Sequence, residues 1–386
     1  MPLKNQKSKA AIAICVYNLE LGGAQIQALQ YARAIKHLKS YPVYMLGLQK
    51  GRGLEQALKQ HGIDYECADI RIGSFHGHLF NRLKELLKLR RILRKRKTLT
   101  IIPFTYYPNV IGITASFLAG SKYRIWNQRG RELSTPVSKS ERIAIRLATH
   151  YLGNSGEMAT YLNTRHGLSR DRIHILKNAL LERTKEKGKV PTRAELGFAE
   201  SDFLVVFVSN FFPAKDHETA IEALQLLSSS HPDIRMLFVG YAPDQHRIPR
   251  LKSLAFDRKL CNKVVFLESK LEISGILGLC DLGLFTAIRE HTEGSPNVIL
   301  DYMNAGLPIV ATNIRPVAEL LNGTQGSLLV EPGSPHELAS ALAKVYENRA
   351  QYAAWGLENK SFVAKHYSFD KLTGSLGLYL SNTIQE

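Results

Sequence analysis

Two carboxylates bracket a short stretch in the second half of the chain that could bind an anion. Glu293 and Asp301 lie eight residues apart, and Gly294, Ser295 and Pro296 directly follow the first of them. Serine is a common N-cap residue, and proline suits the first position of a helix. The amino end of a helix offers N–H groups and a partial positive charge, which suit a phosphate. A ligand with a sugar, a diphosphate and a ribose diol has one group for each carboxylate and a diphosphate for the helix end.

The residues that follow must form the helix that positions both carboxylates. The apolar residues between 298 and 303 predict a helix of about three turns, closed by Gly306 and Pro308. Residues 307–312 then predict a strand that follows after almost no loop, as tight α/β packing requires. An ordinary α/β crossover with both acids exposed would have the same spacing. The short return to a strand favours the ligand site.

Three further candidates follow predicted strands. Gly22 and Gly23 come after a buried strand at 10–17 and before a helix at 24–38, although the G-x-G-x-x-G spacing is missing and a simple tight turn is an alternative. Arg129 follows a strand at 123–127. Because strand ends of open α/β sheets face the ligand, Arg129 could meet a phosphate; it could equally be a surface ion-pair partner. Lys215 lies in the loop after a buried strand at 202–209.

Strands and helices alternate along the chain, and the pattern restarts after a polar, lysine-rich stretch at 182–190. This alternation predicts an α/β protein with two Rossmann-like, doubly wound domains, one at 1–182 and one at 191–365. The 386 residues are enough for two such cores, and no apolar run approaches the roughly 18 residues that span a bilayer. Four widely spaced cysteines indicate a reducing, cytoplasmic setting without a zinc site or disulfides.

The positive charge belongs to the first half. Residues 1–180 hold 30 lysines and arginines against 10 acidic residues, whereas residues 181–386 hold 21 against 24. Nine of these cations and one acid lie at 82–97, in a predicted helix whose apolar residues at 79, 80, 83, 86, 87 and 93 form one stripe. This pattern fits a core-packed helix with a solvated basic face, and it equally fits a surface helix that binds anionic lipid or a pyrophosphate-linked acceptor. Both hold if the stripe packs inward and the basic flank faces the membrane. Nucleic acid is less favoured, because aromatic residues are not interleaved with the charges.

Residues 293–312, EGSPNVILDYMNAGLPIVAT, resemble the Glu-x7-Glu signature of the retaining group 1 glycosyltransferases of family four, with Asp301 in place of the usual second Glu. The resemblance implies the GT-B fold, in which an N-terminal acceptor domain and a C-terminal nucleotide-sugar domain face each other across a cleft. It also implies that a C-terminal helix, here 366–386, crosses back to the N-terminal domain.

The resemblance implies roles for single residues as well. Glu293 would position the transferred sugar and stabilise positive charge at its anomeric carbon, Lys215 would neutralise the diphosphate, and Asp301 would hold the ribose. Asn210 stands where the family usually has Arg, so Arg129 or Arg289 would have to compensate. The expected catalytic residues are Glu293, Lys215 and Arg129; the donor-binding residues are Gly23, Asn210, Lys215, Gly294, Ser295, Pro296, Asn297 and Asp301; the acceptor-binding residues are Gly22 and Arg129.

The resemblance therefore predicts an enzyme, a hexosyltransferase that uses a nucleotide sugar, with UDP favoured, and needs neither cofactor nor metal. The positive charge of the first half indicates that its acceptor is a lipid-linked saccharide, in bacterial surface polysaccharide, lipopolysaccharide or glycolipid assembly. The protein would be cytoplasmic and peripheral on the inner face of the membrane, with no nucleic acid partner. Two alternatives remain: a degenerate sugar-nucleotide-binding partner subunit, suggested by Asn210, Phe212 and Asp301, and a nucleic-acid-binding protein that uses the helix at 82–97.

Overall fold

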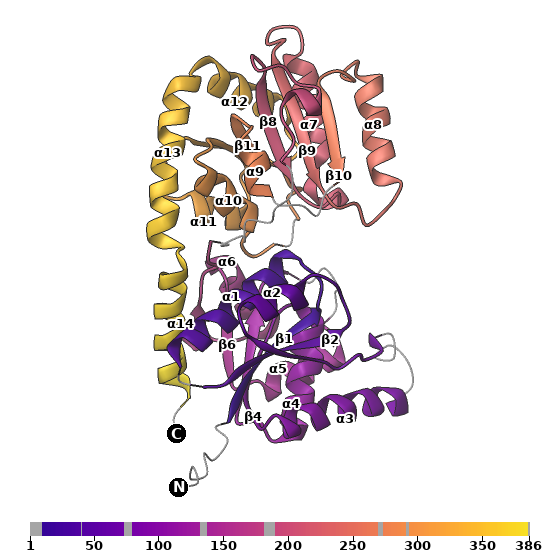
Figure 1. Cartoon of the computed structure of the whole chain (residues 1–386), viewed down its shortest axis with the longest axis vertical. Coiled ribbons are helices and arrows are strands. Elements are labelled where there is room, and N and C mark those ends of the chain that lie inside the picture. The colour runs from indigo at the N-terminus through magenta and orange to yellow at the C-terminus, as the bar shows by residue number, and fades with distance from the viewer. Residues whose placement is uncertain are drawn as a thin grey trace. The chain divides into compact units, whose positions relative to one another are not determined.

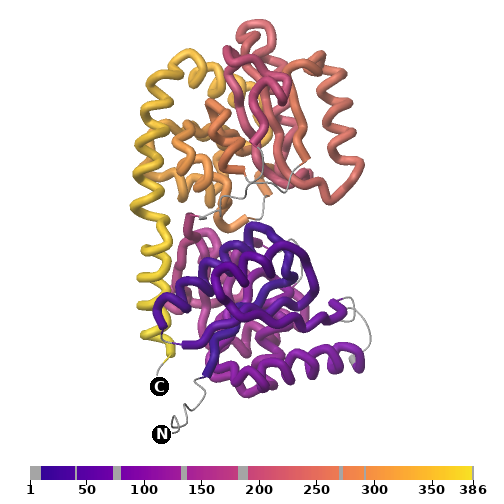
Figure 2. The backbone as a smooth tube through the Cα atoms, viewed as in Figure 1, coloured from indigo at the N-terminus to yellow at the C-terminus, as the bar shows by residue number. Residues whose placement is uncertain are grey.

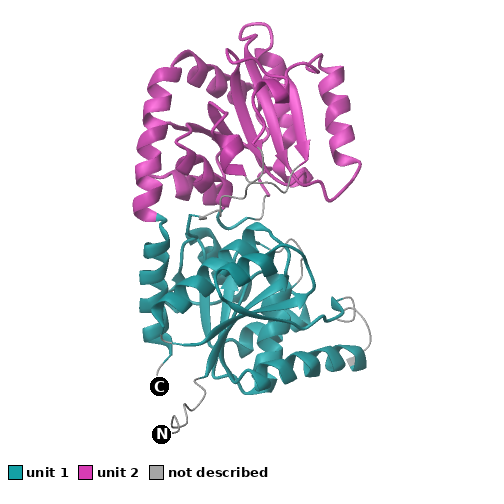
Figure 3. Ribbon diagram, viewed as in Figure 1, with its two compact units in different colours: residues 1–181, 292–295, 367–386 teal, residues 182–291, 296–366 magenta. Residues whose placement is uncertain are grey.

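The computed structural model describes residues 10–39, 41–72, 79–131, 137–180, 190–268, 273–290 and 293–384. The chain forms two compact units (Figure 3). The first comprises Met1–Leu181, Thr292–Ser295 and Tyr367–Glu386, and the second Glu182–His291 and Pro296–His366. The predicted linker at 182–190 lies outside the described residues, except for Val190. No helix in the described ranges combines the length and the apolarity needed to cross a bilayer.

The first unit contains a parallel sheet with the strand order β3-β2-β1-β4-β5-β6-β7 (Figure 1). Its strands are β1 (Ala11–Asn18), β2 (Val43–Gln49), β3 (Asp64–Cys67), β4 (Thr98–Pro103), β5 (Tyr123–Gln128), β6 (His150–Gly153) and β7 (Ile173–Ile175). Its α-helices are α1 (Gly23–Leu38), α2 (Leu54–Gln60), α3 (Leu79–Lys95), α4 (Ile113–Ala119), α5 (Lys139–Leu147), α6 (Gly156–His166) and α14 (Phe369–Thr383). A π-helical turn, η2 (Pro108–Gly112), precedes α4.

Helices cover both faces of this sheet. Alternate residues of each strand point to opposite faces, and the apolar side chains on each face pack against the helices on that side. On β1, Ile12 and Ile14 belong to the core that contains residues of α1 and α14, whereas Ala13 and Cys15 belong to the core beneath α3 and α4. The last helix of the chain, α14, packs along the first, α1, in the first unit (Figure 2). A strand buried on both faces explains the continuous apolar run in the sequence.

The second unit contains a smaller parallel sheet with the strand order β10-β9-β8-β11-β12-β13. Its strands are β8 (Phe203–Val208), β9 (Ile234–Gly240), β10 (Val264–Glu268), β11 (Leu282–Phe285), β12 (Ile309–Thr312) and β13 (Ser327–Val330). Its α-helices are α7 (His217–Leu227), α8 (Arg247–Asp257), α9 (Ile273–Leu277), α10 (Asn297–Ala305), α11 (Arg315–Leu321), α12 (Pro335–Glu347) and α13 (Arg349–His366). A short turn of 3-10 helix, η5 (Pro213–Lys215), lies between β8 and α7.

Each sheet has one point where the strand order reverses. In the first unit the reversal lies between β1 and β4, and in the second between β8 and β11. Open α/β sheets bind ligands at the carboxyl ends of the strands at such a point. The Gly22–Gly23 turn follows β1, the Lys215 turn follows β8, and the segment that leads into α10 follows β11. Arg129 follows β5, one strand away from the first reversal.

Candidate functional site

Arg129 and Glu293, which belong to different motifs of the sequence, lie together in the first unit. Gly130 and Glu293 form an isolated antiparallel bridge. The next amide continues the pairing, because the N–H of Gly294 donates to the carbonyl oxygen of Arg129 at 3.2 Å. The backbone on both sides of the predicted catalytic carboxylate is therefore held by the turn that follows β5.

Asn178 joins the two segments through its side chain. Its Oδ1 accepts a hydrogen bond from the Arg129 guanidinium, and its Nδ2 donates to the carbonyl oxygen of Ser295 at 3.2 Å. Asn178 is itself held from α1, where the Gln27 amide makes two hydrogen bonds with the backbone of Ala179, at 2.7 and 3.1 Å. The sequence motifs assigned no role to Asn178. Its bonds make it a positioning residue for Arg129 and for the segment that carries Glu293.

Gly294 has no room for a side chain. A Cβ built at this position would lie 2.4 Å from Oδ1 of Asn154, 2.6 Å from Cγ of Met158 and 2.8 Å from the carbonyl oxygen of Arg129. Contacts this short would force the backbone away from the β5 turn. The glycine between Glu293 and Ser295 is thus required by the close approach of two backbones.

The charge of Arg129 has no acidic partner within the described ranges. Its guanidinium lies over the rings of Phe104, at 4.6 Å, and Tyr31, at 5.6 Å. Burial lowers the pKa of Arg129, while interaction with Tyr31 acts in the opposite direction. One guanidinium nitrogen is buried and has no hydrogen-bond partner among the described residues. These surroundings do not fit the alternative of a surface ion pair, and they suit an anionic ligand group.

The Gly22–Gly23 turn begins α1. Gly22 is the N-cap residue of this helix, with extended backbone angles, and Gly23 is its first residue. The turn is ordered by side chains, since Nε2 of Gln25 donates to Oδ1 of Asn18 at 2.8 Å. No described contact distinguishes a ligand role for either glycine from the tight-turn alternative.

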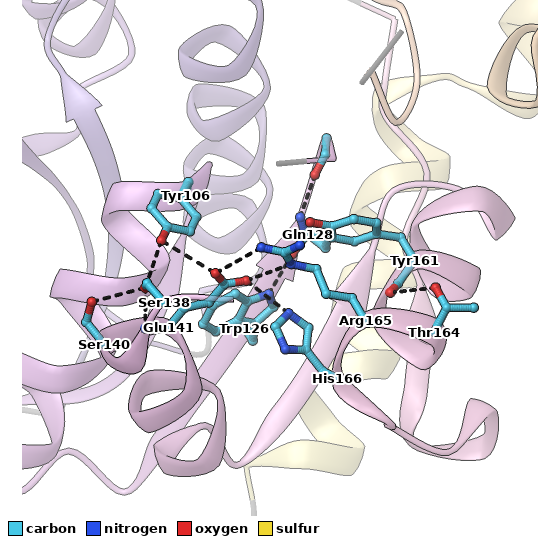
Figure 4. Close-up of polar contacts among 11 residues, drawn as sticks. Tyr106, Trp126, Gln128, Ser138, Ser140, Glu141, Tyr161, Thr164, Arg165 and His166 are labelled. Carbon is cyan, nitrogen blue, oxygen red and sulfur yellow. Dashed lines mark hydrogen bonds and ion pairs between the residues drawn. The ribbon is translucent and has the colours of Figure 1, made fainter. Parts of the chain in front are cut away.

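A buried ionic cluster lies in the first unit between α5 and α6 (Figure 4). The Glu141 carboxylate accepts two hydrogen bonds from the Arg165 guanidinium, at 3.0 and 3.2 Å, and Nε2 of His166 lies 3.2 Å from it. The Tyr106 hydroxyl is 3.5 Å away on another side. Burial raises the pKa of Glu141, but the bonds from His166 and Arg165 and their charges outweigh it and lower this pKa to about 2.

The same region supports the Arg129 turn through β5. The Trp126 indole, which packs edge-on against His166, donates to Oε1 of Gln128 at 2.7 Å, and the Gln128 amide donates to the carbonyl oxygen of Gly130 (Figure 4). Gly130 is the bridge partner of Glu293. A side-chain path therefore runs from the buried cluster to the backbone that holds the predicted carboxylate.

We expect Glu141→Gln to remove part of the acid sensitivity of the first unit. The folded pKa of about 2 is below the ordinary value of 4.5, so the carboxylate stabilises the fold above pH 4.5 and loses this contribution as the pH falls toward 2. Between pH 6 and pH 3 that loss is about 2 kcal/mol. Urea unfolding followed by Trp126 fluorescence, in a Trp355→Phe background, measures it.

Glu55 on α2 is half-buried, and Glu55→Gln is the matched control. It should leave the difference in unfolding free energy between pH 6 and pH 3 as it is in the parent protein. If the Glu141→Gln variant loses as much unfolding free energy between these pH values as the parent protein, the cluster does not hold Glu141 ionised.

In the second unit, Lys215 is placed by the loops that follow β8 and β11. Its side chain is 7% exposed, and its ammonium lies 5.2 Å from the centre of the Phe285 ring. The Thr286 hydroxyl donates to the carbonyl oxygens of Lys215 and Asp216, both at 2.8 Å. A cation is thus fixed at the strand-order reversal of this sheet, and Thr286 is a positioning residue that the sequence did not reveal.

Helix α10 begins one residue later than predicted. Pro296, not Ser295, is the N-cap residue, and Asn297 is the first helical residue. Among the described residues no side chain caps this helix, because the N-cap residue is a proline, which has no side-chain acceptor. Asp301 lies in the second turn and is 8% exposed. The helix closes at Gly306 in the left-handed conformation, as predicted.

Tyr302 fixes α10 to the sheet. Its hydroxyl accepts a hydrogen bond from the N–H of Val208 at 2.8 Å and donates to the carbonyl oxygen of Leu284 at 2.9 Å. Its ring packs on Gly283, where a Cβ would approach to 2.5 Å. One side chain therefore bonds to both strands of the reversal, β8 and β11, and sets the position of Asp301 beside it.

Three nearby residues, Asn210, Arg289 and His217, do not add net positive charge to this region. Asn210 is exposed, and the Arg289 guanidinium pairs with the Glu331 carboxylate at 2.6 Å, with both side chains largely exposed. His217 lies between the rings of Phe207 and Phe211, and burial, followed by the charges of Arg247 and Lys215, lowers its pKa to about 3. Of the two cations expected to compensate for Asn210, Arg289 already has a carboxylate partner.

The described residues include no group of three or more His, Cys, Asp and Glu side chains placed to hold a metal ion. The absence of a metal requirement stays a prediction. Of the predicted residues, the first unit brings together Arg129, Glu293, Gly294 and Ser295, and the second holds Lys215, Asn210, Pro296, Asn297 and Asp301.

Comparison with known proteins relates the second unit to the group 1 glycosyltransferases. Residues 189–362, which make up most of the second unit, match the family described as glycosyl transferases group 1. The chain is 26% identical over 232 residues to a D-inositol 3-phosphate glycosyltransferase of Nocardia farcinica, which covers 58% of this chain and 51% of that protein. It is 24% identical over 204 residues to a GDP-mannose-dependent monoacylated phosphatidylinositol monomannoside mannosyltransferase of Corynebacterium glutamicum, covering 51% of each. The chain thus spans about half the length of these curated relatives.

The fold extends the likeness over the whole chain. The crystal structure of Anabaena HepE in complex with UDP and glucose superimposes with a TM-score of 0.82, at 21% identity, over 97% of this chain and all of that one. The predicted fold class is confirmed: both units are parallel α/β and Rossmann-like, and they match GT-B glycosyltransferase structures.

Proposed function

We propose that this protein is a retaining glycosyltransferase that moves a sugar from a nucleotide-sugar donor to a saccharide acceptor. One observation carries the proposal: Lys215 and the amino end of α10 both lie at the carboxyl ends of β8 and β11, where the strand order of the second sheet reverses. An ammonium group and a helix amino end both suit a diphosphate. The match of residues 189–362 to glycosyl transferases group 1 supports the same assignment.

The donor diphosphate binds at Lys215 and at the start of α10, and Asp301 holds the ribose diol. Glu293 positions the transferred sugar and stabilises the positive charge that develops at its anomeric carbon. The bond from this carbon to the phosphate oxygen breaks as the bond to the acceptor oxygen forms on the same face. The acceptor proton passes to the leaving phosphate. No protein nucleophile, cofactor or metal is assigned. The remaining donor contacts are Gly23, Asn210, Gly294, Ser295, Pro296 and Asn297, and the acceptor contacts are Gly22 and Arg129.

The acceptor in this proposal is a lipid-linked saccharide used in bacterial surface polysaccharide or glycolipid assembly, at the inner face of the membrane. The excess of 30 cations over 10 acids in residues 1–180 supports an anionic membrane partner. The Corynebacterium glutamicum relative is named for an acylated phosphatidylinositol acceptor. UDP is the favoured carrier, because the Anabaena structure contains UDP and glucose.

A second candidate is a sugar-nucleotide-binding partner subunit without activity. It is favoured by the exposed Asn210 at the usual arginine position and by the ion pair of Arg289 with Glu331, which leave Lys215 to compensate the diphosphate. The two candidates share donor binding and differ only in turnover.

A melting screen with UDP-, GDP- and ADP-sugars, followed by assay of donor hydrolysis, separates these outcomes. A donor present at 100 times its Kd should raise Tm by about 5–10 °C, because it binds only the folded state. Stabilisation with release of the nucleoside diphosphate supports the enzyme, and stabilisation without release supports the partner subunit. If none of the three donor classes shifts Tm, both candidates are wrong.

A further inference from the structure

The outward face of α3 carries apolar side chains that the sequence pattern had assigned to the core. Leu89 and Leu93 are buried against the first sheet, whereas Phe80 is 77% exposed, Leu83 47% and Leu87 41%. The prediction of a single apolar stripe is therefore wrong, because the helix has one exposed and one buried apolar stripe on different sides. Solvent exposure of three large apolar side chains within two turns is unfavourable unless something covers them.

The same face carries positive charge. Lys84, Arg91 and Lys95 are exposed and, at about 100° per residue, fall with Phe80, Leu83 and Leu87 within an arc of about 120°. The apolar side chains lie toward one edge of this arc and these three cations toward the other. The exposed Arg94 falls on the apolar side of the arc, where its Nε donates to the carbonyl oxygen of Ala119. Glu85, the only acid between residues 82 and 97, is buried on the opposite side. We call the six exposed residues Phe80, Leu83, Lys84, Leu87, Arg91 and Lys95 the α3 face.

The α3 face is rigidly mounted on the first unit. Nε of Arg90 donates to the carbonyl oxygen of Leu118 at 2.9 Å, and Nε of Arg94 donates to that of Ala119 at 3.4 Å. These bonds tie α3 to the carboxyl end of α4, where the guanidinium groups also meet the helix dipole favourably. Phe117 on α4 is a further exposed aromatic side chain. The exposed residues of α3 are thus presented by a packed helix rather than by a loop.

We propose that the α3 face docks on the surface of an anionic phospholipid bilayer. Phe80, Leu83 and Leu87 enter the boundary between headgroups and acyl chains, while Lys84, Arg91 and Lys95 contact lipid phosphates. An interfacial helix has this combination of one apolar edge, one cationic edge and low net hydrophobicity. The phosphates of a nucleic acid would pair with the cations but would leave the apolar side chains exposed to water. The carboxylates of an acidic protein surface would also pair with the cations and leave the apolar side chains exposed.

This inference gives the membrane association in the proposed function its surface, yet its test needs neither donor nor acceptor. Vesicle binding by the full chain is measured without sugar transfer. A protein that binds vesicles through the α3 face but transfers no sugar would refute the proposed enzyme and leave the docking surface intact. A protein that transfers sugar but does not bind vesicles would refute the docking surface and leave the proposed enzyme intact.

Flotation with phosphatidylcholine vesicles, with and without about 30% phosphatidylglycerol, tests the surface. The parent protein should float only with the anionic vesicles. The Lys84→Gln, Arg91→Gln, Lys95→Gln variant should bind them about 100-fold more weakly, since each cation contributes about fivefold near such a surface. The Phe80→Ser, Leu83→Ser, Leu87→Ser variant should bind at least about 10-fold more weakly, because the apolar contribution is lost.

Helix α8 supplies matched controls in the second unit. It presents Phe256, which is 70% exposed, and the exposed cations Arg250 and Lys252, with Lys259 just beyond its end. Phe256→Ser and the triple glutamine variant at 250, 252 and 259 should bind anionic vesicles as the parent does. If they weaken binding as much as the α3 variants do, the protein has no dedicated surface on α3.

A fluorescence measurement distinguishes insertion from charge attraction alone. The emission of Phe80→Trp should shift to the blue on addition of anionic vesicles, whereas Phe256→Trp should not change. An unshifted Phe80→Trp, or serine variants that bind as well as the parent, would overturn the proposal. The proposal would also be overturned if the protein bound a 30-base-pair DNA more tightly than vesicles at equal salt, and if this binding were lost in the α3 glutamine variant and kept in the serine variant. That result would show that the α3 face is a nucleic acid surface.

Discussion

Glu293→Gln should lower the turnover of sugar transfer by about 100-fold or more. Charge that develops only in the transition state is stabilised by a fixed group, and loss of one such group costs about 2.7–4 kcal/mol. Glu293 is fixed because the bridge to Gly130, the amide bond from Gly294 to Arg129 and the bond from Asn178 to Ser295 hold its backbone on both sides. Steady-state kinetics with a donor identified by the melting screen measures the loss.

The affinity for the nucleoside diphosphate should change less than about threefold in the same variant, since the proposed role of Glu293 is at the sugar and not at the phosphates. Glu290→Gln, which changes an exposed acid three residues earlier in the chain, is the matched control and should keep the parent rate. A turnover of Glu293→Gln within threefold of the parent value would show that this carboxylate does not act on the reacting sugar.

Much of the fold could be predicted from apolar runs and turn residues. The strands predicted at 10–17, 123–127 and 202–209 correspond to β1, β5 and β8 within one residue at each end, because a strand buried on both faces is a continuous apolar run between polar turns. Three helices, α8, α9 and α11, were not predicted. Two of them, α8 and α11, have a proline in the first turn, Pro249 and Pro316, where the missing N–H breaks no helical bond, so a residue that usually ends a helix is tolerated there.

Helix α3 shows what periodicity cannot decide. Phe80, Leu83 and Leu87 have the spacing of a buried stripe, and so do Leu86, Leu89 and Leu93. Only the packing against the first sheet determines which stripe is covered, and that packing depends on strands far away in the chain. The sequence therefore indicated an amphipathic basic helix but assigned some of its exposed residues to the core.

The individual residues of the candidate site could be predicted from the sequence, but the contacts that hold them in place could not. Local patterns identified Lys215, Arg129 and Glu293, because each lies in a loop that follows a strand. Their supports are long-range contacts: Asn178 contacts Arg129 and Ser295, and Thr286 bonds to the Lys215 turn. Such contacts arise only when the strands are ordered in the sheet, and one sequence by itself does not give that order.

Lys215→Met should weaken both donor binding and transfer, with a loss of about 100-fold or more in kcat/KM. The ammonium is a buried positive charge at the strand-order reversal of the second sheet, and Arg289 pairs with Glu331 instead of adding to it. A diphosphate carries charge in the bound donor and gains more as it leaves, so a loss of this cation acts on the ground state and on the transition state. Methionine keeps the length of the side chain over the Phe285 ring without the charge.

Calorimetric titration with UDP and steady-state kinetics separate the two effects of this substitution. Lys252→Met, at an exposed lysine of α8, is the control that removes the same charge from the same unit, and it should change neither quantity. Lys215→Arg should recover part of the affinity, because the charge returns with a different reach. If Lys215→Met binds UDP within threefold of the parent and transfers sugar at the parent rate, the diphosphate does not bind beside η5, and the placement of the donor in the second unit is wrong.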